Sequence, residues 1–263
     1  MAFKYTIAAA LGGAALTLGA IAPAEAFTAT SSSITDQEFN QLILDGAFSE
    51  LFVAETRTGN ASTNPAEREF GVNAPLVPNA NNDGLVGGLP LDAGNRNLTS
   101  GETFDFELMY NAVTGQINYN VGGQLLEATI GNVPANGIFL RTNAQGRNTQ
   151  NGSTQSSEIT LSNLMLDDGN GFQAVPSLTS LFTQGNSRDT DYLVIADLMG
   201  SFTLKGQQTL SWDGLLPSNS RLAAQIKVGT FNDPESVPEP ATILGIATVA
   251  GLGLGLKRRR LQA

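Results

Sequence analysis

The chain has 263 residues, a formal charge of −10, and neither cysteine nor histidine. These absences exclude disulfides, c-type haem attachment and zinc sites built from thiolate or imidazole ligands. They also exclude catalysis by a Ser-His-Asp or Cys-His arrangement. A chain without cysteine must be stabilised by core burial and cannot use disulfides.

The N-terminus is typical of a secretory signal peptide. A short basic start precedes an apolar stretch, residues 7–22, and Ala24 and Ala26 fit the small-x-small cleavage rule. We expect signal peptidase to remove residues 1–26 and the mature chain to begin at Phe27. The alternative is that the apolar stretch stays in place as an anchor.

The next segment, residues 27–236, has the length of one large all-β domain. It contains nine Lys and Arg against 22 Asp and Glu, which gives a formal charge of −13. Such acidity keeps an extracellular protein soluble. It also argues against nucleic acid as a partner, because no basic patch is present to neutralise phosphates.

One helix is predicted near the start of this domain. Thr35 and Glu38 have the spacing at which a hydroxyl and a carboxylate cap each other's backbone N–H groups. Gly46 stands where a left-handed residue ends a helix. The pattern predicts a helix over residues 36–45.

After this helix the apolar period changes from helical to two, which is typical of strands. The expected strands are residues 51–58, 103–110, 116–121, 124–130, 138–141, 159–166, 192–198, 201–205, 208–212 and 222–228. Those between 103 and 130 should form a three-strand meander. The polar stretches 59–98 and 142–157 are expected to be loops. The pattern predicts a β-sandwich of two antiparallel sheets, jelly-roll or concanavalin-like.

Two carboxylates on one of these strands are a candidate catalytic pair. Asp105 and Glu107 alternate with Phe104, Phe106 and Leu108 and fall on one face, about 7 Å apart by strand geometry. Paired carboxylates at such a separation can hydrolyse glycosides. A solvated outer face without catalysis is the interpretation we favour.

Acidic pairs elsewhere are weak calcium candidates. Asp167 with Asp168, and Asp189 with Asp191, stand among Asn, Gly and Thr residues, where a Ca²⁺ ion could bridge loops. Plain turns are the favoured interpretation, since Asp, Asn and Gly are the usual turn formers. We therefore predict no metal or other cofactor, with Ca²⁺ as the alternative.

The C-terminal segment, residues 237–263, has three parts in a fixed order. Val237, Pro238, Glu239 and Pro240 come first, and an uncharged apolar run, residues 241–256, follows. This run is close to the minimum of about 17 residues that spans a bilayer. The segment ends in a basic cluster: Lys257, Arg258, Arg259 and Arg260. Basic residues favour the cytoplasmic side, so the rest of the chain is expected outside the inner membrane.

This order resembles the PEP-CTERM sorting signal of exosortase substrates. The resemblance implies that exosortase cuts near residues 238–240, after a transient stay in the inner membrane, and passes the protein to the cell surface or extracellular matrix. A permanent C-terminal anchor is the alternative. Residues 35–40, 50–55, 114–115 and 225–230 also resemble the choice-of-anchor surface domains, type W, of cyanobacteria, which implies anchoring and no reaction.

The sequence thus predicts an exported surface or matrix protein that is not an enzyme. We expect it to act as a structural or adhesive module associated with extracellular polysaccharide. Two alternatives stay open: a glycan-active enzyme that uses carboxylates such as Asp105 and Glu107, and a Ca²⁺-dependent adhesin.

Overall fold

The structure is a computed structural model that describes residues 27–59, 69–146, 155–183, 188–217 and 219–232. The predicted signal peptide with Ala24 and Ala26, the motif Val237–Pro240, the apolar run 241–256 and the cluster Lys257–Arg260 lie outside these residues. Within the described ranges, no helix has the length and hydrophobicity needed to cross a membrane. The described chain is mainly β, with antiparallel sheets and one short helix, as the sequence predicted.

The first sheet has seven antiparallel strands. Their order across the sheet is β1 (Thr28–Ser32), β14 (Asp189–Gly200), β10 (Ala135–Ala144), β16 (Leu222–Phe231), β2 (Phe48–Arg57), β3 (Phe70–Asn73) and β6 (Pro90–Gly94). The first and last of the described strands, β1 and β16, are thus separated in this sheet by β14 and β10.

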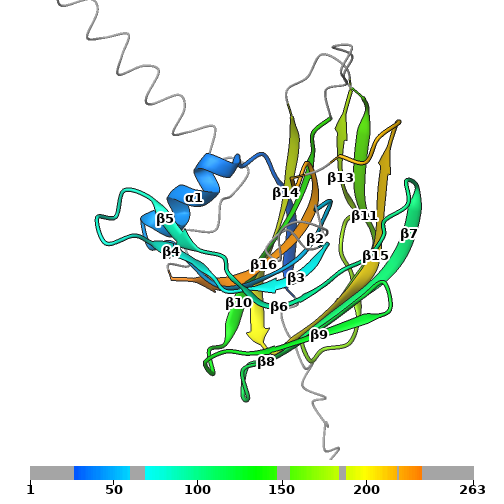
Figure 1. Cartoon of the computed structure of the whole chain (residues 1–263). Coiled ribbons are helices and arrows are strands. Elements are labelled where there is room, and N and C mark those ends of the chain that lie inside the picture. The colour runs from blue at the N-terminus through cyan, green and yellow to red at the C-terminus, as the bar shows by residue number, and fades with distance from the viewer. Residues whose placement is uncertain (1–26, 60–68, 147–154, 184–187, 218, 233–263) are drawn as a thin grey trace, which may run out of the picture.

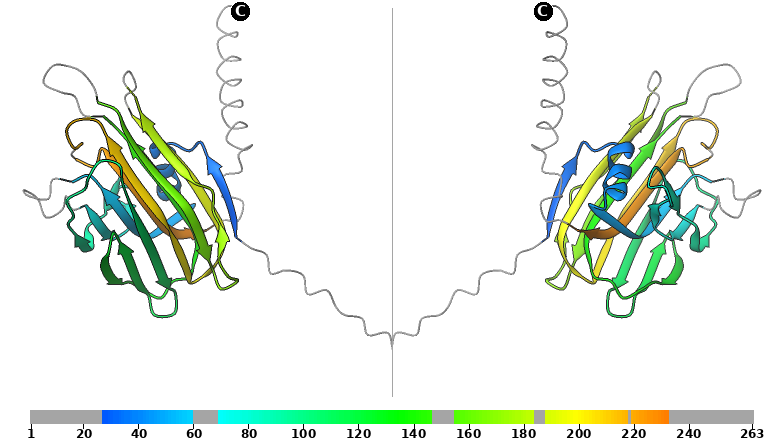
Figure 2. Two further views of the ribbon diagram at one scale, coloured as in Figure 1. Left: turned by 90° about the vertical axis from the view of Figure 1, so that its right-hand side faces the viewer. Right: turned by 90° about the vertical axis from the view of Figure 1, so that its left-hand side faces the viewer.

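The second sheet also has seven strands and packs face to face with the first (Figure 1, Figure 2). Its order is β12 (Gln173–Ala174), β11 (Ser157–Asp167), β15 (Phe202–Trp212), β7 (Glu102–Asn111), β8 (Gln116–Val121) and β9 (Gln124–Thr129), with β13 (Leu178–Phe182) also paired to β11. A separate hairpin joins β4 (Leu76–Pro78) to β5 (Leu85–Gly87).

The main core lies between the two sheets. Phe52 and Leu140 of the first sheet belong to the same buried cluster as Leu108, Tyr119 and Leu204 of the second. Each of these strands sends alternate side chains inward, which is why the apolar residues recur with a period of two.

A second core lies on the other face of the first sheet, under helix α1 (Asp36–Leu44). Figure 2 (right) shows α1 across this outer face. Phe39 and Ile43 of the helix pack there against Phe48, Phe139 and Tyr192 of the sheet. Covered on both faces, the central strands of this sheet are buried along most of their length.

The predicted capping of α1 is confirmed. The backbone N–H of Glu38 donates to Thr35 Oγ1 at 3.2 Å, and the N–H of Thr35 donates to Glu38 Oε2 at 2.8 Å. Helix α1 ends at Leu44, and Gly46 has a φ of 72° in the left-handed region. The helix therefore ends one residue before the predicted Asp45.

The meander predicted between residues 103 and 130 is confirmed as β7, β8 and β9. Two loop predictions were partly wrong. The stretch 59–98 contains β3, β4, β5 and β6, and the stretch 142–157 begins inside β10, which runs to Ala144. The strands expected at 201–205 and 208–212 are one continuous strand, β15.

Candidate functional site

The outward face of the second sheet carries a hollow of about 800 Å³. Residues of β7 and β15 line it. In Figure 1 these two strands lie on the side of the molecule away from α1. We call this hollow the sheet groove and define it by the six polar lining residues that lie on strands: Asp105, Glu107, Asn120, Asn163, Lys205 and Gln207. They come from β7, β8, β11 and β15, so the groove exists only in the folded sheet.

The alternation predicted for β7 is confirmed. Phe104 and Phe106 are buried, whereas Asp105 is exposed and Glu107 half-buried on the outer face. Across the ladder, Asp105 stands opposite Gln207, and Glu107 stands opposite Lys205. The two predicted carboxylates therefore line one groove, each beside a hydrogen-bond donor of β15.

Three of the groove side chains form a hydrogen-bonded chain. Asn163 Nδ2 donates to Gln207 Oε1 at 2.7 Å, and Gln207 Nε2 donates to Asp105 Oδ1 at 3.1 Å. This order fixes which end of each amide is the donor. Among the described residues, no partner occupies the second oxygen of Asp105 or the side-chain oxygen of Asn163, so both can accept hydrogen bonds from a ligand.

A bulge in β11 places Asn163. The register between β11 and β15 shifts between Ser162 and Met165, and Asn163 has a φ of 51°. A non-glycine residue in the left-handed region carries backbone strain, which the surrounding structure must hold. Bulges commonly redirect a side chain beside a functional site, and here the bulge directs Asn163 to Gln207.

Gly206 makes this bulge possible. A Cβ atom at this position would stand 2.6 Å from Leu164 Cδ2 and 2.9 Å from the carbonyl oxygen of Ser162. Both distances are shorter than van der Waals contact, and the second is to backbone. Only glycine lets β15 pass this close to the bulged strand.

The cations near the groove have their own partners. Lys205 Nζ lies 3.7 Å from the ring centroid of Phe172. Arg96, at the groove margin, is paired with Glu102 and donates to the carbonyl oxygen of Gly122. The groove is therefore a polar surface with carboxylate and amide oxygens presented outward. Arg96 is neutralised by Glu102, whereas Lys205 is held by an aromatic ring and keeps its charge.

The first calcium candidate is the end of β11. Asp167 Oδ1 accepts hydrogen bonds from the N–H groups of Gly169 at 2.8 Å and Gly171 at 2.9 Å, which closes a turn as predicted. Asp168 is 6% exposed; its Oδ1 accepts from Asn170 at 3.1 Å, and its Oδ2 is buried without a protein partner.

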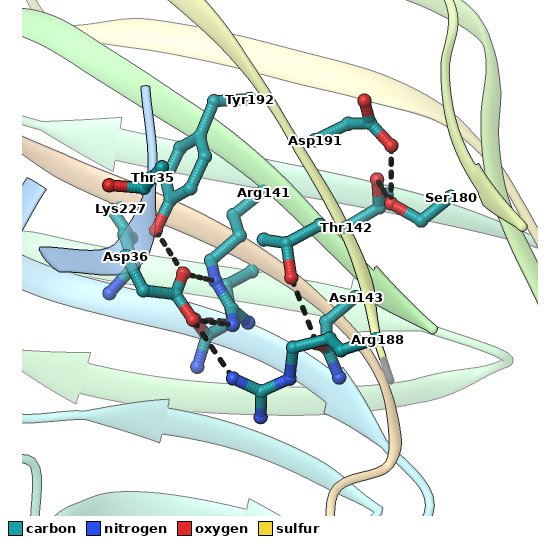
Figure 3. Close-up of polar contacts among 12 residues, drawn as sticks. Thr35, Asp36, Arg141, Thr142, Asn143, Ser180, Arg188, Asp191, Tyr192 and Lys227 are labelled. Carbon is teal, nitrogen blue, oxygen red and sulfur yellow. Dashed lines mark hydrogen bonds and ion pairs between the residues drawn. The ribbon is translucent and has the colours of Figure 1, made fainter. Parts of the chain in front are cut away.

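The second calcium candidate is not a turn, because Asp189 and Asp191 lie in β14. Asp189 accepts from the N–H of Leu181 at 2.7 Å, and Asp191 accepts from the hydroxyl of Ser180 at 2.8 Å (Figure 3). Burial raises the pKa of Asp191, and the charge of Asp189 adds to this. Both carboxylates thus hold β13 against β14. Across the described ranges, no group of three or more acidic side chains is placed to hold a metal ion.

The sequence did not reveal most of the groove. Asn163 and Gln207 are 44 positions apart and meet only through the β11–β15 pairing. Phe172 was also missed, because its position beside Lys205 depends on the turn after β11. One signal was available: Lys205 and Gln207 fall on the face opposite Phe202 and Leu204 if β15 is taken as unbroken through Gly206.

No protein-family model matches the chain, and no curated protein matches it. The interpretation of the sheet groove therefore depends on its own residues: carboxylates and amides in fixed orientation on an open sheet face.

Proposed function

We propose that the protein is exported, sorted by exosortase to the cell surface or extracellular matrix, and binds extracellular polysaccharide in the sheet groove. The proposal of export and sorting is supported by the signal-peptide pattern and by the order of motif, apolar run and basic cluster at residues 237–263. In this proposal, residues 241–256 span the inner membrane until the chain is cleaved. Residues 27–236 form a sandwich of the jelly-roll or concanavalin-like type.

The observation that carries the binding proposal is the chain from Asn163 through Gln207 to Asp105. A sugar offers hydroxyl groups that both donate and accept, and a surface with oriented amides and a carboxylate matches them. Because these side chains are held by one another before any ligand arrives, less conformational entropy is lost on binding.

The test is binding of the full-length protein to a panel of soluble polysaccharides, with Gln207→Ala as the variant. Removing the middle of the chain should weaken binding by roughly fivefold to tenfold, because each lost hydrogen bond contributes about 1 kcal/mol. Gln37→Ala is the matched control, since Gln37 is an exposed residue of α1, far from the groove. The proposal is wrong if no polysaccharide binds.

A second function, glycoside hydrolysis, is favoured by one observation: Asp105 and Glu107 line the same groove. It is tested by release of reducing sugar from the same panel, by the unchanged protein and by Asp105→Asn. We expect no release from either, since we propose a binding function without catalysis. Release that disappears in Asp105→Asn would instead establish an enzyme.

A further inference from the structure

A second hollow, of about 380 Å³, adjoins the sheet groove on the same face. The register shows the continuity: the pair Glu107 and Lys205 of the groove is followed, two residues along, by the pair Met109 and Thr203 of the second hollow. On β8, Asn120 lines the first hollow and Asn118 the second. The two hollows are therefore successive parts of one surface.

The second hollow differs from the first in carrying large apolar side chains that are exposed, whereas Phe104 and Phe106 of the first are buried. Met109 is 44% exposed and Met199 is 74% exposed, and both line it. We call it the methionine hollow. Amide and hydroxyl side chains, among them Asn118 and Thr203, surround the two methionines. Exposed thioether side chains adapt their shape to apolar surfaces such as the C–H faces of a sugar ring.

The charges of the surface restrict what can occupy it. The described residues that line the methionine hollow include Asp167 and Asp168 but no Lys or Arg. In the sheet groove, Lys205 lies against Phe172, and Arg96 is paired with Glu102. Lys205 keeps its charge, but the carboxylates that line the two hollows outnumber it and would repel a polyanion: Asp105, Glu107, Asp167 and Asp168. A protein partner is disfavoured as well, because a stable interface needs a contiguous apolar centre within about 1,000 Å² or more of buried surface.

We propose that the two hollows form one track that binds an extended segment of a neutral polysaccharide along β7 and β15. From Asp105 to Asn111 the track covers six residue steps, or about 20 Å at roughly 3.3 Å per residue. The sheet groove takes sugar hydroxyls, and Met109 and Met199 cover the C–H faces of the following sugars. This inference depends on the proposed polysaccharide binding and adds its ligand class and its second subsite.

The experiment measures affinity of the full-length protein for neutral laminarin, dextran and hydroxyethylcellulose, for anionic alginate and for cationic chitosan. Short and long oligosaccharides of the polymer that binds are then compared. The variant Met109→Thr/Met199→Ser should lose roughly tenfold affinity for long oligomers, from lost apolar contact, and little for short ones. Gln207→Ala should weaken both. Leu125→Ser is the control, because Leu125 is an exposed apolar residue of the same sheet that lines neither hollow.

Each outcome separates the two proposals. If no polymer binds, the proposed function itself fails. If a neutral polymer binds and Gln207→Ala weakens it, but the methionine variant binds long and short oligomers unchanged, the binding function stands and the track is overturned. Preference for alginate or chitosan, or saturation of the track by another protein, would overturn the neutral-glycan assignment. Circular dichroism of the variants establishes that each loss is local, since both methionines are exposed.

Discussion

Arg141 forms a bidentate ion pair with Asp36: its Nε and Nη2 atoms each donate to one carboxylate oxygen at 2.7 Å (Figure 3). The hydroxyl of Tyr192 donates to the same carboxylate at 2.7 Å, and Arg188 donates at 3.2 Å. Asp36 is the first residue of α1, whereas Arg141 and Tyr192 belong to β10 and β14. This charge-assisted cluster attaches the start of the helix to the first sheet.

Acid should weaken this attachment. Burial alone would raise the pKa of Asp36, but the hydrogen bonds and charge of Arg141, with Tyr192 and Arg188, outweigh it and hold the pKa below its usual 3.8. A carboxyl with a depressed folded-state pKa contributes stability above its unfolded pKa and loses it as pH falls through the folded value. Asp36→Asn should therefore lower the free energy of unfolding by about 1–2 kcal/mol at neutral pH, discounted for partial exposure, and by little in strong acid.

The measurement is denaturant unfolding at neutral pH and in acid well below 3.8. Asp45→Asn, at the other end of the helix, is the control, because the Asp45 side chain accepts a hydrogen bond from Gln41 at the surface and makes no ion pair with the described residues. An Asp36→Asn deficit of the same size at both pH values would contradict this assignment.

Lys227 and Glu50 form a second, more deeply buried pair, with Nζ 3.4 Å from Oε2 and 4.6 Å from the ring centroid of Phe39. Burial raises the pKa of Glu50, although Lys227 and the N–H of Leu76 oppose this. Lys227→Met leaves the carboxylate unpaired and should cost about 3–5 kcal/mol of unfolding free energy. Adding Glu50→Gln should recover most of that loss.

The pH dependence of the single Lys227→Met variant gives an independent check. A carboxyl with a raised folded-state pKa favours the protonated form, so its stabilising effect is present below the unfolded pKa and is lost as pH rises through the folded value. The variant should therefore lose stability between mild acid and neutral pH, and the double variant should not. Equal pH profiles would show that Glu50 is not the cause.

Local patterns predicted the elements that carry their own signal. The reciprocal caps of Thr35 and Glu38 located α1 to within one residue, and β8 begins and ends where its alternation does, at Gln116 and Val121. In both cases the deciding interaction is between neighbours in the chain or follows directly from burial of one strand face.

The remainder depends on contacts between distant segments. All four residues of β3 are buried, so Phe70–Asn73 shows no alternation that would mark it as a strand. Gly206 resembles a turn residue in sequence, yet it lies inside β15. It is glycine because the bulge at Asn163 leaves no room for a side chain. The alternation of β7 predicted the outward face of Asp105 and Glu107, but the position of Asn163 in the groove depends on that bulge and is not visible in any local pattern.

Calcium should leave thermal stability unchanged. Asp167 already accepts two backbone N–H groups, and Asp189 and Asp191 accept from Leu181 and Ser180. A ligand that binds only the folded state raises Tm, so the test is Tm with added Ca²⁺ and with EDTA. A rise with Ca²⁺ that is abolished in Asp167→Asn would favour the alternative of a Ca²⁺-dependent adhesin.

Proteolytic processing is expected to coincide with the limits of the described fold. Phe27 is 8% exposed and packs into the main core, and β1 starts at the next residue. At the other end β16 stops at Phe231, six positions before Val237. Cleavage after Ala26 and near residues 238–240 would therefore remove none of the described strands and should leave the stability of the described fold unchanged.

The check is intact mass, with mapping of the terminal peptides, of the native protein recovered separately from inner membrane, outer envelope and culture medium. We expect Phe27 as the first residue and an end near Pro238–Pro240, outside the inner membrane. An added mass at that end would identify the attached group. Recovery only from the inner membrane, with Lys257–Arg260 still present, would show a permanent anchor. The basic cluster would then be held in the cytoplasm and the sandwich on the other side of the inner membrane. In that case the polysaccharide track would act at the periplasmic surface.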